Sequence, residues 1–366
     1  MKWVRTAPLG FFELAHELWQ CQSGRKKYSF WVEAQYGKQL SAIRLKKRLI
    51  DEFTKALSQT AHRNQKIFLK SRSTNKECPI CRALTSCKTD VVEIWGGIYR
   101  RCSKCNHFFV PNLPSKSTLE KFYRNEKSYQ ATYADSKRAA LRVREVAMPK
   151  LEWTIQRYKK VYGREPRSLL DIGAGSGHFV FAALQRGISA NGIEISESGV
   201  SFAKEVFNVN LMPIDFISHA RNLPAYDLIT FWGCIEHVPD PVTMLTCAFQ
   251  KLEHNKGMVV VEVPRWYSLS TAIQLFLREK SIRHLVPDSH IHVFSEESIA
   301  TALWITGLVP AAVWYFGLDV FELIMQLTHC HKGNLETFAH YIPYFQNIFD
   351  QHTLSDFMAI ASVPRR

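Results

Sequence analysis

The sequence predicts an α/β protein built on a parallel sheet, and three features in chain order support this fold class. An apolar run at residues 169–172 predicts a buried strand. The loop that follows contains three closely spaced glycines and leads into a helix that starts at His178. A second apolar run ends in the carboxylate of Glu194, where a parallel sheet presents ligand-binding residues. This order of strand, glycine loop, helix and acid-ended strand is typical of a nucleotide-type cofactor site.

The glycine spacing decides between the two cofactors that this pattern allows, a dinucleotide and S-adenosylmethionine (SAM). A dinucleotide loop has the spacing G-x-G-x-x-G. Gly173, Gly175 and Gly177 instead follow G-x-G-x-G, and His178 stands where the third glycine is needed. Asp171, which directly precedes the loop, suits a cationic amino group better than a pyrophosphate. We therefore expect SAM.

A later segment carries a resemblance to a known family. Residues 225–241 (AYDLITFWGCIEHVPDP) predict a fourth strand that runs into Glu236, His237 and a proline-marked helix start. With the earlier motifs, residues 165–264 closely resemble the class I SAM-dependent methyltransferases. The resemblance implies a Rossmann-like, seven-stranded methyltransferase domain. Its third, fifth, sixth and antiparallel seventh strands are expected at 210–216, 257–264, 308–316 and 357–363.

Each part of SAM needs a different receptor. Backbone N–H groups after Gly177 suit its carboxylate, because unpaired amides at a helix start favour an anion. Asp171 suits the amino group, and Glu194 can accept both ribose hydroxyls. The resemblance implies that Asp215 takes the adenine amino group, although a strand-end turn residue is an equal alternative, and Phe216 can stack on the ring. The cofactor-binding residues are thus predicted to be Asp171, Gly173, Gly175, Gly177, Glu194, Asp215, Phe216 and Trp232.

Catalysis of methyl transfer consists mainly of aligning the acceptor and removing its proton. His237 is the leading candidate for the general base, because it lies just past the fourth strand at the ligand-binding edge of the sheet. Alternatively, Glu236 and His237 form an architectural corner beside the cofactor. His290 and His292 are expected to face the acceptor, with a structural role left open for at least one of them. The catalytic candidates are therefore Glu236, His237, His290 and His292.

Four of the nine cysteines predict a zinc ribbon. CPIC (78–81) and CSKC (102–105) are two matching C-x2-C pairs on short β-rich pieces. Such knuckles bring four thiolates, from Cys78, Cys81, Cys102 and Cys105, into a tetrahedron around Zn²⁺. A redox pair would need only one C-x-x-C. The other five cysteines have no such spacing and are interpreted as free thiols, mostly in the core: Cys21, Cys87, Cys234, Cys247 and Cys330.

The chain is expected to contain four parts. Residues 1–75 are predicted to be a basic segment of two or three amphipathic helices, and 76–115 the zinc ribbon. Residues 116–163 are predicted to be a helical connector over the cofactor, opened by a capping box at Ser117–Glu120, and 164–366 the methyltransferase domain. The uncharged stretch 302–318 is divided by Gly307 and Pro310, so we interpret it as a helix end and a buried strand and not as a membrane span.

Charge and composition limit the function. The net charge of +14 is concentrated in residues 1–75, where 15 Lys and Arg face 5 Asp and Glu. That surplus fits a solvated helix surface or a surface for an acidic partner such as RNA. No secretory signal is visible, so a reducing, cytoplasmic location is expected.

The ribbon resembles that of zinc-ribbon methyltransferases of sugar and polysaccharide pathways. We expect O- or C-methylation of a small molecule, sugar-type acceptor or glycan precursor. An RNA methyltransferase and a non-catalytic SAM-binding scaffold are the alternatives, and the oligomeric state is not predicted.

Overall fold

A computed structural model provides the coordinates of the protein. It describes residues 1–6, 14–38, 45–46, 52–68, 75–86, 91–115, 135–253, 256–331 and 335–365. The predicted capping box at Ser117–Glu120 and the following helix lie outside the described residues, as does Cys87. No described helix is long and apolar enough to cross a membrane.

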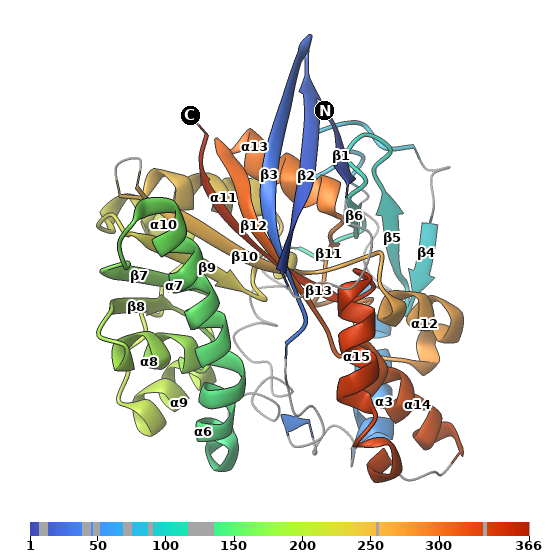
Figure 1. Ribbon diagram of the computed structural model, residues 1–366. Helices are drawn as coiled ribbons and strands as arrows, with labels where there is room; N and C mark the ends of the chain where they lie inside the picture. The colour runs from blue at the N-terminus through green and yellow to red at the C-terminus, as the bar shows by residue number, and fades with distance from the viewer. Residues whose placement is uncertain are drawn as a thin grey trace.

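A nine-stranded sheet forms the centre of the fold (Figure 1). Its strand order is β1-β2-β3-β12-β13-β10-β9-β7-β8. β7, β8, β9 and β10 run parallel, and β13 is antiparallel to both β10 and β12. The strands are β1 (Lys2–Thr6), β2 (Leu14–Ser23), β3 (Lys26–Tyr36), β7 (Ser168–Ile172), β8 (Ser189–Ile193), β9 (Leu228–Trp232), β10 (Met258–Pro264), β12 (Leu308–Phe316) and β13 (Phe357–Pro364).

The sheet is covered on both faces, as its apolar strands require. Leu169 and Leu170, neighbours in β7, pack into two different hydrophobic clusters. The Leu169 cluster contains residues of α7 (Met148–Tyr162) and α8 (His178–Gln185), and the Leu170 cluster contains residues of α11 (Pro241–Gln250) and α13 (Glu296–Ile305). A short helix α6 (Ala139–Arg142) and a π-helical turn (Val143–Ala147) precede α7, whose first turn contains Pro149. Helices α9 (Glu197–Phe207) and α10 (Phe216–His219) follow β8.

The prediction of helices at the start of the chain is wrong. Residues 2–36 form β1, β2 and β3, and β3 pairs in parallel with β12, so this segment extends the main sheet. Burial alternates along β2, where Trp19 and Cys21 are buried and Gln20 is exposed. Gly24 (φ +63°) makes the two-residue turn between Ser23 and Lys26. Successive side chains of a strand point to opposite faces, so residues two apart are buried together on one face of the hairpin. In a helix the same residues would not share one face. In the described part of residues 1–75, the long helix is α3 (Phe53–Phe68).

The seven expected strands of the methyltransferase domain are found with one exception. The segment 210–216 makes an isolated parallel bridge, Ile193 to Met212, in place of a full third strand. The strand at 308–316 and the helix before it confirm that 302–318 is a helix end, a turn and a buried strand. The segment between β12 and β13 is mostly helical and contains α14 (Asp319–His331) and α15 (Ile342–Gln351).

A second, four-stranded sheet in the order β11-β6-β5-β4 contains the cysteine-rich segment. Its strands are β4 (Val91–Ile94), β5 (Gly97–Arg101), β6 (Phe108–Phe109) and β11 (His292–Val293). β11 belongs to the insertion after β10, residues 265–293, which also contains α12 (Leu269–Leu277). The cysteine-rich segment is therefore paired by a strand with the part of the chain that contains the candidate histidines.

Candidate active site

The carboxyl ends of β7, β8 and β9 open onto a cavity of about 980 Å³. This volume is at the upper end of the range of about 300–1,000 Å³ that ligand pockets span. Asp171, Glu194 and Trp232, at or just past the ends of these strands, line it on one side, and residues of the 282–290 insertion line it on another. The position agrees with the rule that open parallel sheets bind ligands beyond the carboxyl ends of their strands.

The glycine loop divides into ligand-facing and packing positions. Gly173 and Gly175 line the cavity and have φ of +73° and +57°. Gly177 does not line it: it is the residue before α8, where an added Cβ would lie 2.8 Å from the Cβ of Ala203. Gly177 thus allows α8 and α9 to approach each other. Gly173 and Gly175 thus face the cavity, where their cofactor role stays a prediction, and Gly177 packs against α9 instead.

Asp171 lies at the base of the cavity with a fixed side chain. The hydroxyl of Thr230 donates a hydrogen bond of 2.6 Å to Asp171 Oδ1. Burial raises the pKa of Asp171 to about 7, and the Thr230 bond and the ammonium of Lys150 oppose this rise. A cationic amino group placed here would favour the charged carboxylate. The site therefore fits the amino end of SAM.

Glu194 is held by backbone amides on both carboxylate oxygens. Gly175 N donates to Oε2 at 2.8 Å, and Ser196 N donates to Oε1 at 2.7 Å. A carboxylate offers about four lone-pair directions, so these two amides leave acceptor capacity for ribose hydroxyls. Burial raises the pKa of Glu194 in spite of the amide donors. The glycine loop and the acid are thus one preorganised unit.

The predicted adenine site is only partly formed by the expected residues. Asp215 lines the cavity and also caps α10, where its Oδ1 accepts from Ser218 N at 2.8 Å. Phe216, predicted to stack on the adenine, is 2% exposed, packs edge-on against Phe231 and does not line the cavity. The first turn of α10 rotates its side chain into the core, and Ile217 faces the cavity in its place. Trp232 lines the cavity as expected.

Glu236 and His237 lie together just past β9 and both line the cavity. The ring of His237 contacts the carbonyl oxygen of Ser289 through Nδ1 at 2.8 Å, which makes Nδ1 the donor and leaves the lone pair on Nε2. That Nε2 lies 3.7 Å from Glu236 Oε1. Burial lowers the pKa of His237 to about 4 and raises that of Glu236 to about 8. Near neutral pH the pair is therefore an uncharged imidazole beside a carboxylic acid.

The two histidines of the insertion point in different directions. His290 lines the cavity, and its ring centroid is 4.9 Å from that of His237. His292 does not line the cavity, so the prediction that it faces the acceptor is wrong. Its Nε2 donates to the carbonyl of Val238 at 2.9 Å, and its Nδ1 lies 3.1 Å from Nε2 of His107. His290 follows a turn at residues 287–289 and lies outside β11, which covers His292 and Val293.

Two groups of side chains have the donor atoms for a metal ion among the described residues. Each group places its candidate ligand atoms within 4.8 Å of one another. One consists of Cys78, Cys81, Cys102 and Cys105, in which the Sγ atoms of Cys78 and Cys105, and of Cys81 and Cys102, are 3.5 Å apart. This spacing fits four Zn–S bonds of roughly 2.3 Å. The other consists of Glu236, His237 and His290. Of the remaining cysteines, Cys21 and Cys234 are buried, Cys247 is partly exposed and the side chain of Cys330 lies outside the description.

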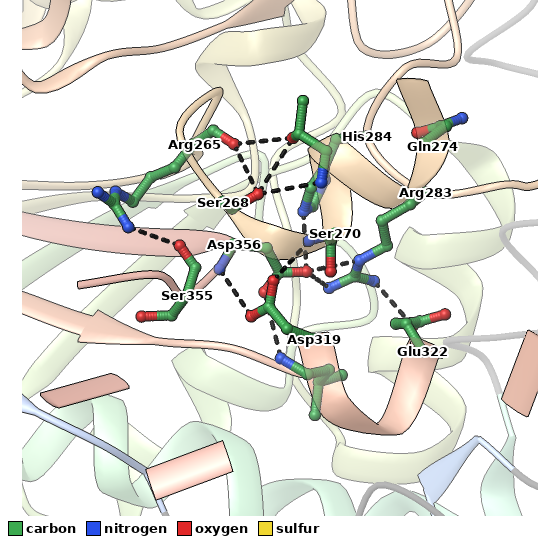
Figure 2. A network of polar contacts seen from close by, with 12 residues as sticks. Arg265, Ser268, Ser270, Gln274, Arg283, His284, Asp319, Glu322, Ser355 and Asp356 are labelled. Atoms are coloured by element: carbon green, nitrogen blue, oxygen red, sulfur yellow. Dashed lines mark hydrogen bonds and ion pairs between the residues drawn. The ribbon is translucent and has the colours of Figure 1, made fainter. Parts of the chain in front are cut away.

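Sequence reasoning missed a set of charged residues that complete the cavity. Arg283 and His284 come from the insertion and meet at Asp356, which Figure 2 shows between them. His284 Nε2 lies 3.0 Å from Asp356 Oδ2, and Arg283 also reaches Glu322 Oε1 at 3.2 Å. Burial lowers the pKa of His284, which the Asp356 contact opposes. These residues are brought together only by the packing of the insertion on α14 and β13.

The middle of the chain matches a family model. Residues 145–313 match the model of a methyltransferase domain. The chain therefore contains a methyltransferase domain. The matched residues of this domain include Asp171, Glu194, His237 and His290, and they exclude the four-cysteine cluster and the strands β1 to β3.

Curated relatives of the methyltransferase domain are ubiquinone biosynthesis O-methyltransferases. That of Saccharophagus degradans is 33% identical over 89 residues, which are 22% of this chain and 38% of that enzyme. That of Hydrogenovibrio crunogenus is 24% identical over 144 residues, 38% of this chain and 59% of that enzyme. The chain thus spans between 38% and 59% of the length of these two relatives.

Solved methyltransferase structures also match. The plantazolicin methyltransferase BamL, in complex with a triazolic desmethylPZN analogue and S-adenosylhomocysteine (SAH), is 16% identical to this chain with a TM-score of 0.44. The match covers 68% of this chain and 97% of that one. Magnesium protoporphyrin IX methyltransferase from Synechocystis PCC 6803, with bound SAH, is 13% identical with a TM-score of 0.44, covering 69% of this chain and 100% of that one.

Proposed function

We propose that this protein transfers the methyl group of SAM to an oxygen or carbon atom of a small molecule, such as a sugar-type acceptor or glycan precursor. One observation carries this proposal. The residues expected to bind SAM, Asp171 and Glu194, share one cavity with a candidate base, His237. O-methylation is also the reaction in the names of the curated relatives.

The cofactor end of the cavity is organised for the polar ends of SAM. Asp171 would receive the amino group, and the amides of the glycine loop that start α8 would receive the carboxylate. Glu194, already oriented by Gly175 and Ser196, would accept the ribose hydroxyls. Asp215 supports the adenine amino group, with Ile217 in place of Phe216 as the apolar wall. When bound, SAM supplies a methyl group on a positively charged sulfur.

His237 is the proposed general base. Its Nδ1–H is fixed by the carbonyl of Ser289, so Nε2 can accept the proton that the acceptor loses when the new bond to carbon forms. Glu236 lies on the same side of the ring and supplies an oxygen near the protonated imidazole. Buried surroundings keep His237 uncharged before the reaction. The acceptor would lie between His237, His290 and the cofactor.

The cysteine cluster is proposed to hold one structural Zn²⁺. Three of its four thiols are buried, and its chain segment contacts the catalytic corner through the His107–His292 pair and through Arg82, which bonds Asp240 at 3.0 Å. A closed site with four thiolate ligands has no open position for a substrate. The metal would therefore stabilise the fold that supports the corner and would take no part in chemistry.

Calorimetry with SAH and a transfer assay with labelled SAM test the proposed function. Gly175→Arg would fill the space for the methionine end and should abolish SAH binding. Gly187→Arg is the matched control, because Gly187 has a similar φ of +77°, open space around it and no contact with the cavity. Absence of SAH binding by the wild type would contradict a cofactor role. Binding without transfer to any sugar nucleotide, hydroxy acid or alcohol would favour a non-catalytic scaffold.

A further inference from the structure

Cationic side chains from distant parts of the chain meet in the active-site cavity. Three come from the N-terminal region, two from the helical connector and one from the insertion after β10. They are Lys38, Lys46, Arg63, Arg142, Lys150 and Arg283. Cations in such number at a cavity wall either neutralise carboxylates of the protein or bind an anionic ligand. The partners of five of them, all except Arg142, distinguish these two uses.

Besides Lys150, which is described below, three of these cations are paired with carboxylates of the protein. Lys46 Nζ lies 2.6 Å from Glu322 Oε1, and Arg283 contacts Glu322 and Asp356. Arg63 forms an ion pair with the buried Asp288. These contacts link the N-terminal region and the insertion to each other, and they satisfy the charges involved. A structural role is sufficient to explain them.

Lys38 is different. It follows Gly37, which is fixed to β12 by a bond from Trp314 Nε1 to its carbonyl (2.7 Å) and a bond from its N–H to Tyr315 (2.8 Å). Its ammonium lies 5.6 Å from the ring centroid of Trp314 and 5.1 Å from that of Phe316. Among the described residues, no carboxylate oxygen lies within ion-pair distance of Lys38. Aromatic faces attract a cation but leave its hydrogen-bond donors unused.

Lys150 is the second cation in this part of the cavity. The carboxylate of Glu262 attracts both its ammonium group and that of Lys38. Lys150 Nζ lies 2.7 Å from Glu262 Oε2 and 4.7 Å above the ring of Trp232. Burial lowers the pKa of Lys38 to about 7, with the ammonium of Lys150 as the next largest cause and the attraction of Glu262 acting against both. Lys150 is paired with Glu262 and also acts on Asp171 and Glu236, so Lys38 is the ammonium that has no carboxylate partner among the described residues. A partly buried, unpaired ammonium costs free energy unless an anion compensates it.

We propose that Lys38 and Lys150 bind a negatively charged group of the methyl acceptor, a carboxylate or a phosphate. The inference rests on the proposed function, since it assumes that the acceptor occupies this cavity. Trp232 is the last residue of β9, the strand that leads to His237, so Lys150 lies beside the proposed place of methyl transfer. Ile282, Val286, Phe316 and Phe357 add an apolar wall. The acceptor is thus an oxyanion with an apolar or ring-shaped body, and uncharged alcohols are poor acceptors.

Calorimetry on the SAH-saturated protein tests this inference with three matched probes. Benzoate and phenyl phosphate carry the two anionic groups on the same ring, and benzamide is the uncharged counterpart of benzoate. We expect the wild type to bind at least one anion tenfold or more tightly than benzamide, and the tighter anion identifies the group. Lys38→Met should remove that preference, and Lys38→Arg should retain part of it. Lys27→Met, on the exposed hairpin turn, is the control and should bind as the wild type does.

The outcomes separate this inference from the proposed function. Because no carboxylate oxygen of the described residues lies within ion-pair distance of Lys38, Lys38→Met should melt at the wild-type temperature or above it, so a loss of anion binding cannot be assigned to unfolding. Equal binding of benzoate, phenyl phosphate and benzamide by the wild type would overturn the inference while SAH binding still supports the cofactor site. A loss of SAH affinity of tenfold or more in Lys38→Met would also overturn it, because the anion would then be the carboxylate of the cofactor.

Discussion

His107 and His292 form a direct contact of 3.1 Å between their ring nitrogens, and this contact joins the cysteine-rich segment to the catalytic corner. His107 lies two residues after Cys105, and the other ring nitrogen of His292 donates to Val238, the residue after His237. Both rings are buried, with exposures of 0% and 2%. The side chains of His107 and His292 therefore connect the cysteine cluster to the loop that contains the proposed base, His237.

Replacement of His292 by alanine should lower stability and leave the chemistry of bound substrates intact. The change removes two buried hydrogen bonds and leaves the carbonyl of Val238 without its donor, at a cost of about 1–3 kcal/mol for each unsatisfied group. Thermal denaturation measures the loss. His290→Ala is the comparison, because His290 lines the cavity and its loss should affect acceptor turnover more than melting. A turnover defect in His292→Ala at a temperature where it is folded would restore His292 to the catalytic group.

Loss of one cysteine ligand should unfold the second sheet. We expect Cys102→Ser to contain well below one zinc per chain and to melt at a lower temperature, since a small metal-bound unit draws much of its folding free energy from the ion. Cys247→Ser is the matched control, because Cys247 is partly exposed and far in sequence from the cluster. Elemental analysis and melting curves provide the readouts. A metal-free wild type prepared with ample zinc would contradict the zinc site.

The sequence was sufficient to predict the part of the site in which neighbouring residues of a strand and the loop after it lie together. Asp171, the glycine loop and Glu194 lie where the parallel strands required them. The first hairpin also had a local signal, the alternation of Trp19 and Cys21 followed by a turn at Gly24. It was misinterpreted because apolar residues between Phe11 and Trp19 also recur near helical spacing. Helix and strand periods are hard to separate in segments this short.

The acceptor end of the cavity could not be predicted from any short stretch of the sequence. Lys38, Lys150 and Arg283 are separated by more than one hundred residues in each case and meet only through the packing of the hairpin, α7 and the insertion. His290 and His292 are two residues apart, which would place them on one face of a strand. β11 starts at His292, so the local backbone and not the spacing decides that only His290 faces the cavity.

Glu236→Gln should stabilise the protein more at alkaline than at acidic pH. Burial raises the pKa of Glu236 from 4.5 to about 8, so between these values the folded state keeps a proton that the unfolded state has released. The free energy of unfolding of the wild type therefore falls as the pH rises through this window. Glutamine does not titrate, so the difference in melting temperature should grow by ~2 °C or more between pH 5 and pH 8.5. Exposed Glu205→Gln should show no such trend.

The basic N-terminal region is not expected to bind RNA. Its strands belong to the main sheet, so deletion of residues 1–75 would disrupt the fold and cannot test this point. Substitution of Arg25, Lys26 and Lys27, which are exposed at the hairpin turn, by serine leaves the paired strands in place. We expect weak RNA binding by both proteins in filter or fluorescence assays. Tight wild-type binding that falls steeply with salt and is lost in the variant would instead support an RNA methyltransferase.

Substitution of His237 separates its catalytic role from an architectural one. If Nε2 accepts the acceptor proton, His237→Ala should lower kcat by ~10² to 10⁴ with SAH affinity nearly unchanged, because proton removal stabilises the transition state and not the bound cofactor. His237→Asn is the second variant, since its amide can still donate to Ser289 but cannot act as a base. Burial lowers the pKa of His237 to about 4, so the wild type should keep its activity down to acidic pH, well below the ordinary histidine range. Normal turnover in His237→Asn would remove His237 from the chemistry and leave His290 as the base to test.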